Sequence, residues 1–382
     1  MDLIMKNLLN LIFVILFFGC NSENGKIIHP TTENIPDLNL ENVRVTNTGS
    51  NHFEIDSITK HLNTIEVQEV ISENEGEYSN LFGFITDIVI DSYNRIYILD
   101  ERRQDISIFN DEGKFLKKIG GKGAGPGETE SAKSLSIYND ERLLVSNFNR
   151  IEVFKIKEND IEFYNSENFE KPVNNLCIIG DTLFTYSPIV ISKYRDSEKN
   201  YFPIIHAYSM PEMKFLFSFG ESYKSEKLPI VSQLSFGEMS CNENTSTVIF
   251  EFDRFPFLYG YSSKNGSLKW VNIFDELQMP IIEESMRGGQ IGIGFNSSEN
   301  KFRDSILRTK TLLDNYQLVQ VDRRLIPEEN SYVSESEVMS FIIDANTGKS
   351  IYLGKEIPRI LGSSKDLLIG VNSDYVQALL LK

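Results

Sequence analysis

Four short apolar runs recur as a unit along this chain, and this recurrence constrains the fold more than any other feature. In residues 84–120 the runs are FITDIVID, RIYILD, DISIF and KFLKKIG, separated by turn residues such as Asn94 and Gly113. Short apolar runs bounded by Gly, Asn and Asp are typical of antiparallel β-strands. A unit that repeats at this spacing predicts tandem four-stranded sheets. Further units with the same rhythm occupy residues 134–169, 172–220, 231–274 and 302–354.

The C-terminal end of the chain holds only three more strand-like runs, so a sixth unit needs one strand from elsewhere. Residues 62–71, LNTIEVQEVI, alternate apolar and polar positions before the first unit and can supply it. We therefore expect an all-β fold, a six-bladed β-propeller of four-stranded antiparallel blades over residues 52–382, whose ring an N-terminal strand closes. A pair of β-sandwich domains is the competing interpretation. The Gly-led turns before the last strand of several units favour blades.

The first 19 residues are typical of a secretory signal, because Lys6 precedes a short apolar run that ends at Gly19, before Cys20. The ending FFGC resembles the lipobox of bacterial lipoproteins, in which cleavage leaves a cysteine that carries the lipid. We expect a lipoprotein signal peptide at residues 1–19, a polar tether at 20–51, and attachment to the lipid bilayer through acylated Cys20. This predicts an exported outer-membrane lipoprotein, on the periplasmic or the cell-surface side. An ordinary signal peptide with an incidental cysteine is the alternative.

The net charge narrows the choice of partners. The 382 residues include 38 Lys and Arg against 55 Asp and Glu, a net charge of -17. Nucleic acid is therefore not expected as a partner, because phosphate contacts need a concentrated basic surface.

Cys177 and Cys241 each lie inside a β-like run, which favours two buried free thiols over a disulfide and over a metal site.

One stretch of the sequence resembles a known family. Residues 85–128, ITDIVIDSYNRIYILDERRQDISIFNDEGKFLKKIGGKGAGPGE, look like a repeat of the NHL-type six-bladed propellers. Together with the leader, the chain resembles the exported six-bladed propeller lipoproteins of Bacteroidota. This resemblance implies a fold and a location. Members of that family mostly lack an assigned activity, so the resemblance implies no catalytic residue.

Arginines recur in the turns that follow the second strand of several units. In a four-stranded blade these turns share one face of the disc with the links between blades. The arginines could form a positively charged rim around one end of the channel. Such a rim binds carboxylate, sulfate or phosphate groups, since a guanidinium offers a planar pair of donors. Alternatively, each arginine pairs with a neighbouring Asp and ties turns together. The predicted ligand-binding residues are Arg102, Arg103, Arg150, Arg254, Arg323 and Arg324.

No pattern of residues points to a catalytic centre. Of the four histidines only His206 lies within the repeats, where it is expected to be a strand residue, and neither a metal nor a cofactor is expected. The glycines of residues 120–128 lack the strand, helix and Lys-Ser/Thr pattern of a phosphate loop, so a structural turn is favoured. Asp87, Asp91 and Asp100 are expected to serve as turn and cap residues.

The sequence therefore favours a lipid-anchored propeller of the cell envelope that acts as a binding or scaffolding module, with an unidentified protein or an anionic glycan as its partner. The alternative is an exported lyase or hydrolase that acts on glycans or small molecules through channel carboxylates or a metal. The two differ at the axis, where an enzyme needs converging acidic groups and a scaffold needs only a filled channel.

Overall fold

The structure is a computed structural model that describes residues 27–28, 43–48, 66–72, 82–194, 201–287, 289–296, 302–313, 315–325, 336–363, 367–371 and 375–380. The predicted signal peptide and Cys20 lie outside these residues. Within the described part of the chain, no helix is long and apolar enough to cross a membrane.

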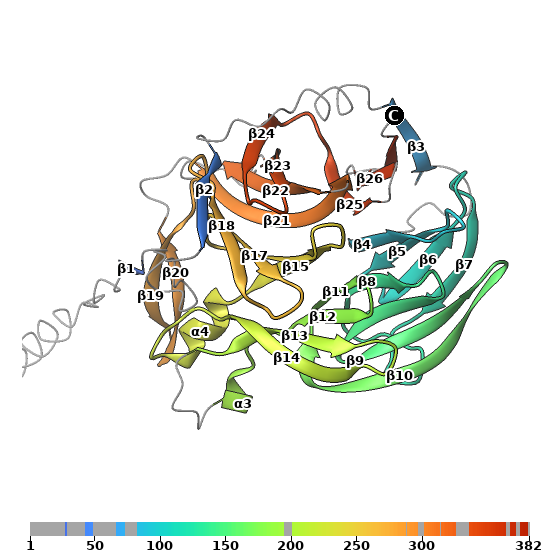
Figure 1. Cartoon of the computed structure of the whole chain (residues 1–382), viewed down its shortest axis with the longest axis horizontal. Coiled ribbons are helices and arrows are strands. Elements are labelled where there is room, and N and C mark those ends of the chain that lie inside the picture. The colour runs from blue at the N-terminus through green and yellow to red at the C-terminus, as the bar shows by residue number, and fades with distance from the viewer. Residues whose placement is uncertain are drawn as a thin grey trace, which may run out of the picture.

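Six sheets stand around a central axis, and each corresponds to one unit of the sequence (Figure 1). Blade 1 contains β4 (Ile85–Ile90), β5 (Ile96–Asp100), β6 (Asp105–Phe109) and β7 (Phe115–Gly120); blade 2 contains β8 (Ala132–Tyr138), β9 (Arg142–Lys157) and β10 (Asp160–Val173); blade 3 contains β11 (Asn175–Ile179), β12 (Thr182–Tyr186), β13 (Pro203–Ser209) and β14 (Lys214–Glu221). Blade 4 contains β15 (Gly237–Asn242), β16 (Thr247–Phe252), β17 (Phe257–Ser262) and β18 (Leu268–Ile273); blade 5 contains β21 (Phe302–Leu313), β22 (Tyr316–Leu325), β23 (Ser336–Asp344) and β24 (Ser350–Gly354); blade 6 contains β25 (Arg359–Ser363), β26 (Leu367–Val371), β27 (Tyr375–Leu380) and β3 (Glu66–Ser72).

The ring closes through the N-terminal strand. β3 pairs antiparallel with β27 as the outermost strand of blade 6, so the two ends of the propeller share one sheet. The first strands of the blades, β4, β8, β11, β15, β21 and β25, contact one another in that order, and β25 contacts β4. The prediction of an all-β, six-bladed propeller closed by an N-terminal strand is confirmed.

Blade 2 has three strands because its second and third strands form one continuous element. The N–H of Ile156 donates a hydrogen bond of 2.7 Å to the carbonyl of Glu141, beside the start of β9. A straight strand would hold these residues about 50 Å apart, at about 3.3 Å per residue. β9 therefore folds back on itself, and Phe148, with φ of 50°, lies at the bend.

Two short strands of the predicted tether are paired with other elements. β2 (Arg44–Asn47) lies parallel to β18 as a fifth strand of blade 4, and β1 (Ile27–Ile28) pairs with β19. The Thr46 hydroxyl donates a 2.6 Å hydrogen bond to the carbonyl of Gly348 in blade 5. The segment thus covers the junction of blades 4 and 5, whereas the expected domain boundary at residue 51 stays a prediction.

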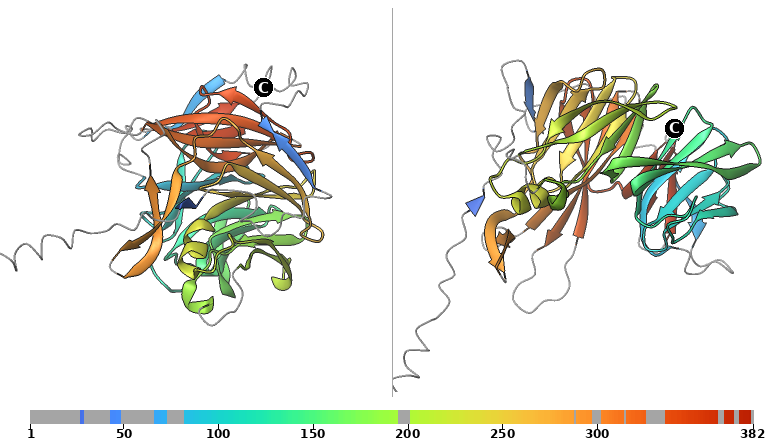
Figure 2. Two further views of the ribbon diagram at one scale, coloured as in Figure 1. Left: turned by 90° about the vertical axis from the view of Figure 1, so that its left-hand side faces the viewer. Right: turned by 90° about the horizontal axis from the view of Figure 1, so that it is seen from below.

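A hairpin and two short helices decorate the links between strands. The hairpin consists of β19 (Ile281–Arg287) and β20 (Gln290–Asn296), and it projects away from the sheets (orange in Figure 2). The helices are α3 (Ile191–Tyr194) and α4 (Leu228–Leu234). The N–H of Ile293 donates to the side-chain carbonyl of Gln233 at 3.1 Å, so α4 supports the hairpin.

One face of the propeller carries the turns that matter for the predicted site. We call it the linker face, because each first strand starts there, each second strand ends there, and the links between blades cross it. Asp100 is typical of its turns, since its carboxylate accepts hydrogen bonds from the main-chain N–H groups of Phe84, Arg102 and Arg103, all at 3.0–3.1 Å. The expected capping role of Asp100 is confirmed.

Candidate functional site

The six predicted arginines lie on the linker face, but the structure does not gather them into one site. Arg102 and Arg103 follow β5 in blade 1, and Arg150 follows the bend of β9 in blade 2. Arg254 follows β16 in blade 4, and Arg323 and Arg324 lie near the end of β22 in blade 5. Arg254 and Arg324 line a common pocket.

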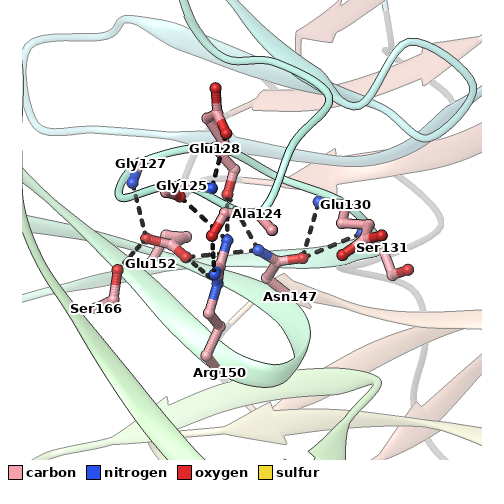
Figure 3. A network of polar contacts seen from close by, with 10 residues as sticks. All are labelled: Ala124, Gly125, Gly127, Glu128, Glu130, Ser131, Asn147, Arg150, Glu152 and Ser166. Atoms are coloured by element: carbon pink, nitrogen blue, oxygen red, sulfur yellow. Dashed lines mark hydrogen bonds and ion pairs between the residues drawn. The ribbon is translucent and has the colours of Figure 1, made fainter.

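Arg150 is held by the glycine-rich linker between blades 1 and 2 (Figure 3). Its guanidinium donates hydrogen bonds of 2.6–3.2 Å to the carbonyl oxygens of Ala124, Gly125 and Glu128. It also forms an ion pair with Glu152, whose carboxylate is buried. These bonds occupy the guanidinium and tie the linker to blade 2, so the contacts of Arg150 are structural.

The same linker, residues 120–128, carries its own carboxylate. The N–H of Gly125 donates a 2.7 Å hydrogen bond to the side chain of Glu128. A Cβ atom at Gly123 would lie 2.1 Å from a carboxylate oxygen of Glu128, so a larger residue there would displace the Glu128 side chain. Main-chain N–H groups in such loops bind anions, and here Glu128 is the anion. The linker is a structural turn, as the sequence indicated.

Arg323 is also engaged within the protein. It donates to both carboxylate oxygens of Asp304, at 2.9 and 2.6 Å, and to the carbonyl of Glu276 at 2.9 Å. The hydrogen bonds to Asp304, on the paired strand β21, raise the pKa of Arg323. Arg103 makes a looser contact of 3.5 Å with Asp105. The contact of Arg103 is of the kind that the ion-pair alternative describes, with an Asp close in sequence. Asp304, in contrast, is neither beside Arg323 in the sequence nor on the next blade.

Arg254 and Arg324 lie in a pocket of about 210 Å³ between blades 4 and 5. Arg324 pairs with Asp322 at 2.6 Å, yet its side chain is 62% exposed and remains accessible from solvent. Asp253, Pro280, Asp304 and Ser305 complete the lining, and Pro280 leads into the hairpin. The pocket therefore presents guanidinium donors beside carboxylate and hydroxyl acceptors.

Asp253 is the most perturbed acid of this pocket. Burial, the largest cause, and the negative charge of Glu238 raise its pKa to about 6, against the opposing positive charge of Arg254. Glu238 and Glu251 are register partners on β15 and β16, and Asp253 is the first residue after β16, two residues beyond Glu251. Of the two acids in the otherwise apolar run TVIFEFD, Asp253 lines this pocket, and the pattern of arginines alone does not reveal it.

The central channel contains an ion pair that the sequence did not reveal. Asp87 and Lys310 meet at 2.7 Å within the channel, from blades 1 and 5, which flank blade 6, beside a cavity of about 240 Å³. Asp87 also accepts hydrogen bonds from the hydroxyl of Ser134 at 3.1 Å and the N–H of Leu135 at 2.8 Å. The expectation that Asp87 caps a turn is wrong, because it points into the channel and joins three first strands.

The prediction of two free thiols is also wrong. Cys177 and Cys241 form a disulfide, with Cα atoms 5.7 Å apart. They lie on β11 and β15, the adjacent first strands of blades 3 and 4, and both line the channel cavity. The closed ring brings the two strands together, although 64 residues separate the cysteines in sequence.

His206 lies in β13, as expected, and is fully buried. Burial and the nearby Lys171 lower its pKa to about 3, and its Nδ1 atom lies 2.7 Å from the Ser218 hydroxyl. Among the residues that the structure describes, no group of three His, Cys, Asp or Glu side chains could hold a metal ion.

Comparisons with known proteins agree with this architecture. Residues 41–227 match the model of the DUF5128 family, which is described as a 6-bladed beta-propeller. No curated protein matches the chain. The crystal structure of a Bacteroides fragilis NCTC 9343 protein whose name predicts export is similar at a TM-score of 0.54 and 14% identity, covering 89% of this chain and 99% of that one.

A second solved structure, a member of the duf4221 family from Bacteroides vulgatus ATCC 8482, is similar at a TM-score of 0.51 and 12% identity. The match covers 84% of this chain and 98% of that one. At such identities the likeness shows the fold alone. By its strand order and by these comparisons, the chain is a six-bladed β-propeller, matched over residues 41–227 by a family of that description.

Proposed function

We propose that this propeller is an exported, lipid-anchored binding module of the cell envelope, and that it binds an anionic ligand in the pocket between blades 4 and 5. Export is supported by the predicted leader and by the Cys177–Cys241 disulfide, since disulfides persist in oxidising compartments and are rare in the cytosol.

The predicted anchor would hold the hairpin side of the protein near the bilayer. Ile27, where β1 begins, is seven residues after Cys20, and seven extended residues span at most about 25 Å. Labelling with a fatty-acid analogue in cells should mark the wild-type protein and not Cys20→Ser. Equal labelling of both proteins would contradict the anchor.

The binding proposal rests on a difference in surroundings among the predicted arginines. Arg150 and Arg323 are held by internal carbonyls and carboxylates and are only 21% and 15% exposed. Arg254 and Arg324 line a pocket, and Arg324, which also pairs with Asp322, is 62% exposed. Two guanidinium groups at one pocket are a suitable receptor for a carboxylate, sulfate or phosphate group, because each offers parallel N–H donors.

Charge reversal tests this proposal. Titration calorimetry with polygalacturonate, dextran sulfate and polyphosphate should show binding of at least one polyanion, weakened at least tenfold by Arg324→Glu. Arg103→Glu is the matched control, because it makes the same change in charge on the same face, outside the pocket. Equal losses in the two variants would indicate non-specific attraction, and wild-type affinity in Arg324→Glu would overturn the assignment of the pocket.

A further inference from the structure

The pocket between blades 4 and 5 combines groups that a simple anion would not use together. Arg254 and Arg324 offer N–H donors, and Ser305 offers a hydroxyl. Asp253, in the same lining, is half-buried and offers carboxylate oxygens. A sulfate ion brings acceptors but no donors, so it would meet the guanidinium groups favourably and the Asp253 carboxylate unfavourably. A fitting ligand needs an anionic group and hydroxyl donors together.

The second acid of the pocket is already satisfied. Asp304 accepts two hydrogen bonds from Arg323 and one of 2.7 Å from the N–H of Gln278. Its charge is therefore balanced within the protein. Asp253 is left as the carboxylate that a ligand hydroxyl would meet, next to the two guanidinium groups.

An exposed aromatic residue is joined to this lining through the main chain. Phe236 is 42% exposed, and its carbonyl accepts the N–H of Asp253 at 3.0 Å. It immediately precedes Gly237, where a Cβ atom would lie 1.9 Å from the carbonyl oxygen of Glu251, so glycine allows β15 and β16 to approach closely here. An exposed ring on a residue bonded to Asp253 offers an apolar surface for the C–H face of a pyranose.

The size of the pocket limits the ligand. Its volume of about 210 Å³ is below the roughly 300–1,000 Å³ of pockets for drug-sized molecules. The pocket therefore holds one small residue rather than a long chain.

We infer that the pocket binds a single uronic-acid residue, with its carboxylate on Arg254 and Arg324, a ring hydroxyl on Asp253, and its C–H face toward Phe236. This inference rests on the proposed function and specifies its ligand class. The residue could be a free sugar acid or the end of an acidic glycan, and both present the same chemistry.

The test compares ligands and variants whose responses differ in sign. Titration calorimetry of the wild-type protein with galacturonic acid, trigalacturonate, galactose and sodium sulfate should show the tightest binding for one of the two uronates. Asp253→Ala should weaken uronate binding at least fivefold, because a hydroxyl acceptor is lost. The same change should strengthen sulfate binding or leave it unchanged, because a negative charge is removed.

Two further variants test where the ligand binds. Phe236→Ala should weaken uronate binding and leave sulfate binding unaffected, and Arg103→Ala should change neither. A circular-dichroism melt of each variant checks that it folds. If sulfate and the uronates bind equally, or if Asp253→Ala shifts both in the same direction, the uronate inference is overturned while anion binding stands. If none of the anions binds, both the inference and the proposed function fail.

Discussion

Blade 4 presents very different surfaces to its two neighbours. Toward blade 3 it is aromatic: the ring of Phe250 lies 5.2 Å from that of Tyr186, and Tyr261 lies 5.3 Å from Phe219. The disulfide joins the same two blades at the axis. Toward blade 5 the pattern changes along the strand, with apolar packing at Ile249 and acids at Glu251 and Asp253.

A single strand produces this contrast. Alternate residues of β16, TVIFEF, point to opposite faces, and all six are buried. Phe250 and Phe252 thus fill the interface with blade 3, while Glu251 is placed between blades, where the Thr309 hydroxyl donates to it at 3.4 Å. Burial of carboxylates reduces stability unless they are paired. Along this strand the blade 3–4 interface is filled with aromatic rings, whereas the blade 4–5 interface is apolar at Ile249 and leaves a pocket beyond the acidic end of the strand.

The largest effect should come from the aromatic interface. Phe250→Ala should lower the free energy of unfolding by about 3–5 kcal/mol, because a fully buried ring is replaced by a cavity. Phe215→Ala is the control, since Phe215 is 59% exposed on the outer strand of blade 3. Urea denaturation measures both. A similar small loss in the two variants would show that the interface with blade 3 is not the stabilising one.

Loss of the disulfide should have the next largest effect. The double variant Cys177→Ala, Cys241→Ala should lose about 2–4 kcal/mol, because the bond closes a long loop in the unfolded chain. Urea midpoints with and without a reductant give the measurement. Wild type should move toward the variant on reduction, and the variant should not respond. A wild-type midpoint that does not change under full reduction would contradict this role.

The acidic side of blade 4 should make stability depend on pH. The folded-state pKa of Asp253, about 6, lies above its ordinary value of 3.8, so the folded protein holds this proton at a higher pH than the unfolded chain. The contribution of protonated Asp253 to the free energy of unfolding is greatest below pH 4, and it is lost as the pH rises through 6. Asp253→Asn should therefore gain about 1–3 kcal/mol relative to wild type between pH 4.5 and pH 7.5.

Urea denaturation at the two pH values measures this difference. Asp111→Asn, in an exposed turn of blade 1, is the matched control and should show no such gain. If the free energies of unfolding of the wild type and of Asp253→Asn change identically with pH, burial of Asp253 does not reduce the stability of the folded protein at pH 7.5.

The smallest effect is expected away from both interfaces. Lys117 and Asp160 form an exposed ion pair of 2.7 Å between blades 1 and 2. Lys117→Ala should change the free energy of unfolding by less than about 0.5 kcal/mol, because solvent and salt screen exposed pairs. A loss comparable to that of Phe250→Ala, measured in the same urea series, would mean that surface pairs and not blade interfaces hold the ring.

Much of the fold could be predicted from local patterns. The turn residues around Asn94 and Gly113 mark strand ends, and the alternating run of residues 62–71 contains the strand that closes blade 6. Only part of the candidate site could be predicted from such patterns. Turn spacing put all six arginines on one face, but it could not show that Arg150 meets main-chain carbonyls while Arg324 borders a pocket.

The sequence by itself determined the number of blades, their strands and the face on which the arginines lie, because hydrophobic period and turn chemistry act over a few neighbouring residues. Tertiary structure alone decided which distant groups meet. Cys177 bonds to Cys241, and Asp87 reaches Lys310 within the channel, because closing the ring brings their strands near each other. Such contacts depend on the positions of whole blades, and no local pattern encodes those positions.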